Sequence, residues 1–241
     1  MPSARPDPLS GPDRPDVLPG DSGGGEKSAP TPPRDRSAAE RRLQQADELA
    51  SGPLPESAVR PYRELLELEP ENVEARLHLA HLLDRLEEAA DAADVLTDGL
   101  RRNPDQTEFL VLRGSILGRL QRYKEADSDL RRVLRLYPSH APAQFELGLL
   151  LWRRGMVQEA AASFHRALEF QPDNAKSYYY LADSLNQLGD LAGARAALER
   201  ALQITSTDAK AYQLMGRVLD RLSLPEEAKE MYRRCRELAR L

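Results

Sequence analysis

Residues 166–190 have the sequence RALEFQPDNAKSYYYLADSLNQLGD, and this stretch contains the signals that decide the fold. A helix is expected to end before Pro172, because proline cannot donate the amide hydrogen bond that would continue it. Asp173 and Asn174 follow, and both residue types favour the N-cap of a new helix. The stretch therefore predicts two helices separated by a short turn.

The same punctuation recurs along the chain with a period of 34 residues. Prolines follow this period at Pro70, Pro104, Pro138 and Pro172, and Ser206 continues it without proline. Two columns have no exception: Ala58, Ala92, Ala126, Ala160, Ala194 and Ala228, and Leu49, Leu83, Leu117, Leu151, Leu185 and Leu219. We therefore divide the chain into six units, which are 39–72, 73–106, 107–140, 141–174, 175–208 and 209–241.

Each unit has the pattern of two amphipathic helices. In the unit 175–208, one apolar stripe has the i, i+3, i+4, i+7 spacing of a helix face and consists of Tyr178, Leu181, Ala182 and Leu185. A glycine and an aspartate then break this helix, and a second stripe of leucine and alanine follows. Two helices joined by so short a loop pack antiparallel. One such pair is too thin to bury both stripes, so the units must stack.

The eighth position of the first helix is always small from the second unit onward. Its residues are Ala80, Gly114, Gly148, Ala182 and Gly216. A glycine inside a helix costs about 1 kcal/mol relative to alanine. Three glycines at matching places therefore predict a repeated close contact, and we expect Ala182 to face Ala194 of the twentieth position across the pair.

These features resemble the tetratricopeptide repeat (TPR) family over residues 39–241. The 34-residue period, the small eighth residue, the alanine at the twentieth position and the terminal proline carry the resemblance. The sequence departs from the family where tryptophan is favoured at the fourth position, and where Arg113 replaces a leucine. The first unit departs most, with Gln45 at an expected core position. The resemblance implies an all-α, right-handed solenoid of stacked antiparallel helix pairs.

The family resemblance also implies a concave groove lined mainly by first helices. From the positions that point away from the core, we expect a peptide-binding groove formed by Val111, Arg119, Phe145, Leu149, Trp152, Arg153, Lys176, Tyr179 and Asp183. Arginines recur at the thirteenth position, as Arg85, Arg119, Arg153 and Arg221. Apolar and aromatic side chains would anchor a partner, and guanidinium groups would orient its carboxylates or carbonyls.

Two alternatives accompany this prediction of the groove. Phe145, Trp152 and Tyr179 would instead pack against the neighbouring helix pair, and the arginine column would be a solvated face. The known carboxylate clamp for chaperone tails, which the family forms with lysine and asparagine at the fifth and ninth positions, is not matched here. The expected function is a scaffold or adaptor for a partner peptide or helix. The alternatives are self-association through the terminal unit and an accessory subunit of a larger complex or of secretion or assembly machinery.

Residues 1–38 differ in composition from the rest of the chain. They contain nine of the 18 prolines and the glycine run 23–25, with only three large aliphatic residues. Prolines remove amide donors, and a segment so poor in apolar side chains cannot bury enough surface to offset the entropy of ordering. The composition therefore predicts a disordered N-terminal tail.

Composition also excludes several function classes. The formal net charge of -5 argues against nucleic acid as the main partner. Cys235 is the only cysteine, and the start of the sequence resembles no signal peptide, so we expect a cytoplasmic protein without a membrane span. His78 and His81 have metal-ligand spacing, and Glu74 stands one turn earlier, but histidines on such a surface are usually polar lining. No catalytic motif is recognisable. We therefore expect no cofactor, no metal and no enzymatic activity.

Overall fold

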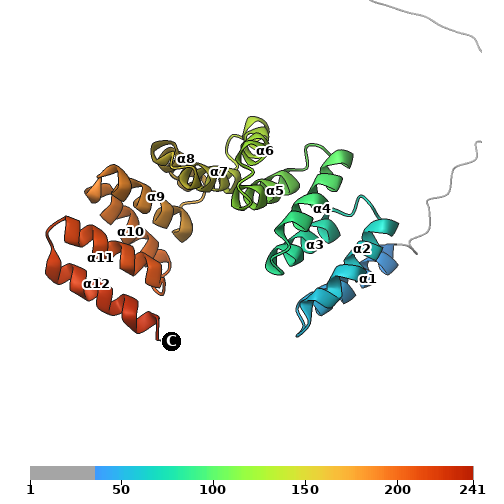
Figure 1. The fold of residues 1–241 in the computed structure, drawn as a ribbon, viewed down its shortest axis with the longest axis horizontal. Coiled ribbons are helices and arrows are strands. Elements are labelled where there is room, and N and C mark those ends of the chain that lie inside the picture. The colour runs from blue at the N-terminus through green and yellow to red at the C-terminus, as the bar shows by residue number, and fades with distance from the viewer. Residues whose placement is uncertain (1–35, 241) are drawn as a thin grey trace, which may run out of the picture.

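The computed structural model describes residues 36–240, which form twelve α-helices and one short 3-10 helix, η1 (Pro55–Ala58). The helices follow one another in six pairs along an arch (Figure 1). The first helices of the pairs are α1 (Arg36–Ala50), α3 (Val73–Arg85), α5 (Thr107–Arg119), α7 (Ala141–Arg153), α9 (Ala175–Leu188) and α11 (Ala209–Arg221). The second helices are α2 (Val59–Leu68), α4 (Ala89–Arg102), α6 (Tyr123–Leu136), α8 (Val157–Phe170), α10 (Leu191–Ile204) and α12 (Pro225–Leu238).

The predicted all-α solenoid of stacked antiparallel helix pairs is confirmed. The predicted disordered tail, residues 1–38, lies outside the described residues except for its last three, which belong to the start of α1. None of the helices in residues 36–240 is both long enough and apolar enough to cross a membrane.

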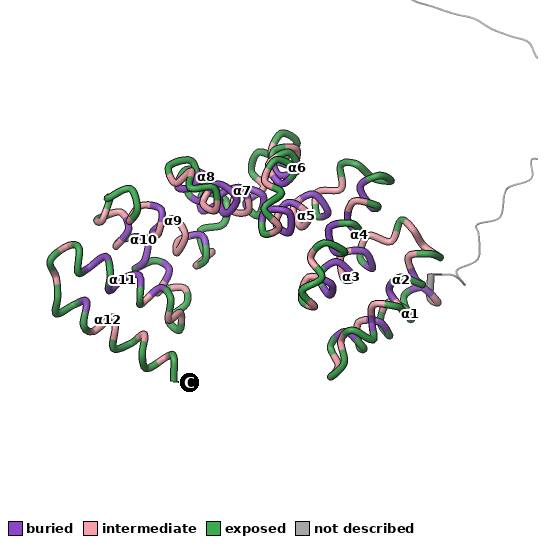
Figure 2. Tube along the Cα trace, in the orientation of Figure 1, coloured by how far each residue is buried: buried purple, intermediate pink, exposed green. Residues whose placement is uncertain are grey.

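Curvature follows from which helices approach one another. Each first helix contacts the next first helix, from α1–α3 to α9–α11, whereas successive second helices are further apart. The first helices therefore lie on the inner side of the arch, as α5 and α7 do beneath α6 and α8 in Figure 1. Buried residues lie along the faces between helices, and the turns that join them are largely exposed (Figure 2).

Side-chain caps start several of the first helices. Asn174 Oδ1 accepts a hydrogen bond of 3.0 Å from the Ser177 amide, which confirms the cap predicted after Pro172. Asn72 and Asp208 cap α3 and α11 in the same way. At α7 the cap is His140, whose Nδ1 accepts from the Ala143 amide at 3.1 Å. These bonds satisfy amides that have no acceptor within the helix.

Glycines of the eighth position make the repeated close contact that the sequence predicts, and their partner is the side chain at the twenty-fourth position. A Cβ atom on Gly148 would lie 2.6 Å from Cε1 of Phe164, which occupies the twenty-fourth position. Gly114 and Gly216 have the same relation to Leu130 and Tyr232. The large side chain of the second helix therefore fills the space above the glycine, and the alanine of the twentieth position is not its nearest neighbour.

The first unit departs from the predicted packing register. Leu49 was expected in the core but is 37% exposed, and Gln45 is exposed as well. Ala46 and Ala50 are buried in their place. The helix α1 is therefore rotated relative to the first helices of the other units, so that small residues, instead of the leucine column, pack on α2 and α3.

Two arginines occupy positions where the family pattern is apolar. Arg76, at the fourth position, is buried and donates to the carbonyl oxygens of Val95 at 3.0 Å and Pro70 at 2.7 Å. Burial lowers the pKa of its guanidinium. Gly99 leaves space for this side chain, because a Cβ atom at residue 99 would lie 2.4 Å from Arg76 Cδ.

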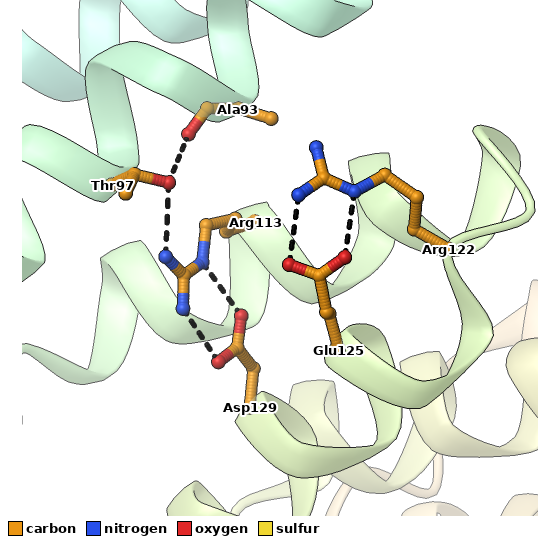
Figure 3. A network of polar contacts seen from close by, with 6 residues as sticks. All are labelled: Ala93, Thr97, Arg113, Arg122, Glu125 and Asp129. Atoms are coloured by element: carbon orange, nitrogen blue, oxygen red, sulfur yellow. Dashed lines mark hydrogen bonds and ion pairs between the residues drawn. The ribbon is translucent and has the colours of Figure 1, made fainter.

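The second of these arginines, Arg113, forms a largely buried ion pair within the third unit (Figure 3). It donates to both carboxylate oxygens of Asp129, at 2.7 and 2.8 Å, and to Thr97 Oγ1 at 2.9 Å. The Thr97 hydroxyl in turn donates to the Ala93 carbonyl. This network replaces an apolar contact between α5 and α6 and extends it to α4.

Candidate binding groove

A pocket of about 630 Å³ opens between the first helices of the fourth, fifth and sixth units. We call it the groove pocket. Its lining consists of Phe145, Glu146 and Leu149 of α7, Lys176, Tyr179 and Tyr180 of α9, and Thr207, Asp208, Ala209 and Lys210 before and at the start of α11. Four of the predicted groove residues therefore lie together, namely Phe145, Leu149, Lys176 and Tyr179.

An aromatic cluster forms one side of the groove pocket. The Tyr180 ring stacks on Phe164 with a centroid distance of 5.6 Å and an interplanar angle of 21°. Phe145 and Tyr179 approach Tyr180 edge-on, at 6.1 and 5.2 Å. Phe145 and Tyr179 are half-buried, so they line the pocket and also pack against neighbouring helices. Packing against the neighbouring helices is therefore observed at both residues, and contact with a partner stays a prediction.

Trp152 and Asp183 are used within the protein. Trp152 Nε1 donates to Asp183 Oδ2 at 2.8 Å, and Gln187 Nε2 donates to the same oxygen at 2.8 Å. This contact joins α7 to α9 beside the groove pocket, but neither Trp152 nor Asp183 lines it. Val111 is half-buried against the core, and it does not line the pocket either.

Glu146 places a buried carboxyl group in the lining. Burial raises its pKa, while a hydrogen bond from Ser115 and the charges of Arg153, Arg119 and Lys176 act in the opposite direction. Its Oε2 atom is buried and has no hydrogen-bond partner among the described residues. Burial, together with the nearby charge of Asp183, also raises the pKa of Tyr179. The pocket therefore contains an acceptor atom that the protein leaves unsatisfied.

Glu146 and Tyr180, both at the sixth position, were missed by the sequence analysis. On a helix, the sixth residue lies on the same face as the second, ninth and thirteenth, because these are separated by three, four or seven residues. The second, ninth and thirteenth positions were all assigned to the groove, so the same helical spacing would have identified the sixth.

Three of the four arginines at the thirteenth position bind the preceding first helix. Arg119 pairs with Asp84, and Arg221 Nη1 donates to the backbone and side-chain oxygens of Asn186, each at 2.5 Å. Arg85 donates to the Ala50 carbonyl at 3.4 Å. We call these three contacts the arginine bridges. Their donors connect adjacent units, so they do not form the free basic row that was one expectation for this column.

Charged residues cover the outward face of the last helix, α12. Lys229 pairs with Glu226, and Arg233 and Arg234 both pair with Glu230. Such ion pairs within one helix suit a face that meets water. Self-association through this terminal unit stays a prediction.

His78, one of the two histidines considered as metal ligands, contacts a carboxylate. Its Nδ1 lies 2.7 Å from Asp47 Oδ1, and Tyr62 donates its hydroxyl proton to the same oxygen. Across residues 36–240, no three histidine, cysteine, aspartate or glutamate side chains come together in a group that could hold a metal ion.

Comparisons with known proteins agree with this architecture of helical repeats. Family models described as tetratricopeptide repeat match residues 55–116, 111–175, 146–209 and 209–240. The chain therefore belongs to the tetratricopeptide repeat family. A search of curated protein sequences gives no match.

Several solved structures have a similar fold. PilW, described as a widely conserved type IV pilus biogenesis factor, is 23% identical, with a TM-score of 0.72 over 80% of this chain and 90% of its own. PilF of Pseudomonas aeruginosa is 21% identical, with a TM-score of 0.71 over 81% and 89%. YrrB, described as a TPR protein with an unusual peptide-binding site, is 19% identical, with a TM-score of 0.57 over 73% and 91%. At these identities the similarity concerns the fold alone.

Proposed function

We propose that this protein is a cytoplasmic, non-catalytic scaffold that binds an extended or helical segment of a partner protein on the inner side of the arch. The groove pocket is the anchor of this interaction. The observation that carries the proposal is the pocket itself, where aromatic and aliphatic side chains of adjacent units surround a volume of about 630 Å³.

The lining of the groove pocket suits a side chain of a protein partner. Tyr179 and Phe145 offer large apolar surfaces that lose little conformational entropy when a ligand covers them. Lys176 and Lys210 provide charges at the pocket, and the unsatisfied Glu146 oxygen provides an acceptor. A pocket that is mostly apolar with a few polar groups is the usual form of a specific binding site.

The proposal is tested by selecting peptides on the full chain. A phage-displayed library of random dodecapeptides is panned on the native protein, and the selected peptides are titrated against two variants. Tyr179→Ala removes a wall of the groove pocket, whereas Tyr137→Ala removes a tyrosine that is 53% exposed elsewhere.

We expect Tyr179→Ala to weaken the selected peptides at least about tenfold, because aromatic residues at the centre of an interface contribute 2 kcal/mol or more. Tyr137→Ala should leave binding unchanged, and far-ultraviolet circular dichroism should show equal helicity for all three proteins. Peptides that bind both variants equally well, or a panning that enriches none, would exclude the groove pocket as the binding site.

A further inference from the structure

The arginine bridges establish how far a thirteenth-position arginine reaches. In each bridge, the acceptor residue stands 35 positions earlier, at the twelfth position of the preceding first helix. Asp84 supplies a carboxylate, Asn186 an amide oxygen and Ala50 a backbone carbonyl. Three independent copies of this geometry show that the guanidinium group lies over the last turn of the neighbouring helix.

Arg153 is the member of this column that has no such acceptor. The residue 35 positions before it is Gly118, which has no side chain. A Cβ atom on Gly118 would lie 3.5 Å from Arg153 Nη1, so the guanidinium already occupies the same place over the neighbouring helix. Within residues 36–240, the guanidinium group of Arg153 makes no hydrogen bond and no ion pair, and Glu146 interacts with it only through its charge.

Further cations without an ion-pair partner lie on the first helices of the fifth and sixth units. They are Lys176, Lys210 and Arg217, and none of their side chains forms an ion pair with a described residue. Two nearby carboxylates accept internal hydrogen bonds, Asp183 from Trp152 and Asp208 from backbone amides. Glu146, the third, is buried, and its raised pKa reflects that burial.

We propose that Arg153 binds a carboxylate of the partner segment, in the place that Asp84 fills for Arg119 one unit earlier. The partner is therefore an acidic segment in which an aspartate or glutamate lies close to an apolar or aromatic residue. Leu149 lines the groove pocket and stands one helical turn before Arg153, so one short segment contacts both. This inference rests on the proposed function and specifies the chemistry of its partner.

Gly118 offers a direct test, because an aspartate there would supply the missing carboxylate from within the chain. A Cβ atom at residue 118 would lie 3.5 Å from Arg153 Nη1 and 3.5 Å from Leu150 Cδ1, which are ordinary van der Waals distances. Gly118→Asp therefore acts as an internal competitor, and Gly118→Ala is its matched control. Arg153→Gln removes the charge by an independent route.

The probes are two fluorescein-labelled decapeptides, titrated by fluorescence anisotropy against the full-length protein. One has a central phenylalanine and leucine flanked by aspartates, and the other has asparagine in place of every aspartate. The native protein and Gly118→Ala should bind the acidic peptide at least about tenfold more tightly than the amide peptide, since a hydrogen bond between two charged groups is stronger than one to a neutral amide. Gly118→Asp and Arg153→Gln should each remove this preference.

The outcomes separate the two proposals. Equal binding of both peptides by the native protein, with loss of both in Tyr179→Ala, would overturn the role of Arg153 and leave the groove pocket as a binding site. A preference for the acidic peptide that survives in both Gly118→Asp and Arg153→Gln would also overturn it. If neither peptide binds the native protein at all, both this inference and the proposed function are rejected for this partner chemistry.

Discussion

Replacing Arg113 by leucine tests how the third unit is held together. Arg113 stands at the seventh position, where Leu79, Leu147 and Leu181 pack in other units, so leucine suits the helix. The substitution removes the hydrogen bonds of 2.7 and 2.8 Å to Asp129 and the bond of 2.9 Å to Thr97. The Asp129 carboxylate then stays at a site where only 8% of its side chain is exposed.

The expected cost follows from what each substitution leaves behind. Removing one partner of a buried pair costs about 3–5 kcal/mol, because the remaining charge is uncompensated. We expect Arg113→Leu to destabilise by about 3 kcal/mol, at the lower end of that range, since Arg113 is 19% exposed and solvent reaches the pair. Asp129→Val leaves Arg113 bonded to Thr97 and partly hydrated, so its expected cost is smaller, about 2 kcal/mol.

The double variant Arg113→Leu/Asp129→Val reproduces the combination Leu79 and Val95 of the second unit. Both charges are then absent, and the Thr97 hydroxyl keeps its bond of 2.8 Å to the Ala93 carbonyl. We expect a cost of about 2 kcal/mol, less than the sum of the single costs by about 3 kcal/mol.

The four proteins are compared by urea denaturation followed with circular dichroism at 222 nm. Units of a solenoid need not unfold together, so hydrogen exchange of α5 and α6 amides in the native state supplies a local measurement of the same free energies. If the double variant loses the sum of the two single losses, Arg113 and Asp129 are not coupled, and the pair in Figure 3 does not hold α5 to α6 as described.

Four further predictions concern packing, capping, titration and assembly. Gly148→Ala should lower the urea midpoint, because its Cβ atom would lie 2.6 Å from Phe164 and overpacking costs about 1–3 kcal/mol. Gly118→Ala should raise the midpoint, because alanine has the higher helix propensity and has room at this site. Equal shifts of the midpoint in the two variants would contradict the close contact at Gly148. Asn174→Ala should destabilise by about 1 kcal/mol through loss of a cap, and an unchanged midpoint would show that the cap is dispensable. Burial raises the pKa of the Glu146 carboxyl group above its unfolded value of 4.5, so the folded chain binds the carboxyl proton more tightly than the unfolded chain does. The free energy of unfolding of the native protein, relative to that of Glu146→Gln, should therefore rise as the pH is lowered from 7 towards 4.5. Light scattering should give a monomer mass at all concentrations, because ion pairs within α12 cover its outward face; a mass that rises with concentration would instead support assembly through the terminal unit.

The fold was predictable because each unit repeats the same packing problem. A side chain that is buried in one unit is buried at the same place in the next, so the 34-residue columns report directly on the core. The prediction was wrong where a unit lacks equivalent neighbours. Leu49 belongs to an unbroken leucine column, yet α1 turns Ala46 and Ala50 into the core instead. A column is informative about burial only when the contacts around it repeat as well.

The sequence predicted several apolar side chains of the groove pocket, but it did not predict the partners of the thirteenth-position arginines. Helical periodicity places Phe145 and Leu149 on one face of α7, and the 34-residue repeat places Tyr179 at the position of α9 equivalent to that of Phe145, without any knowledge of side-chain conformation. The arginine bridges depend instead on which residue stands 35 positions earlier, in another unit. That relation is present in the sequence for Arg119 and Arg221, but one helix considered alone does not reveal it.

A solenoid that uses its inner surface to hold adjacent units together has fewer groups there with which to bind a partner. The arginine bridges occupy the junctions between the first and second, second and third, and fifth and sixth units. At the junction of the third and fourth units, Gly118 leaves Arg153 unpaired. The next junction carries Gln187 at the thirteenth position, which bonds to Asp183 of its own helix. The unpaired Arg153 and part of the groove pocket both belong to α7, so a partner that enters the pocket also meets a cation for which the chain itself does not compete.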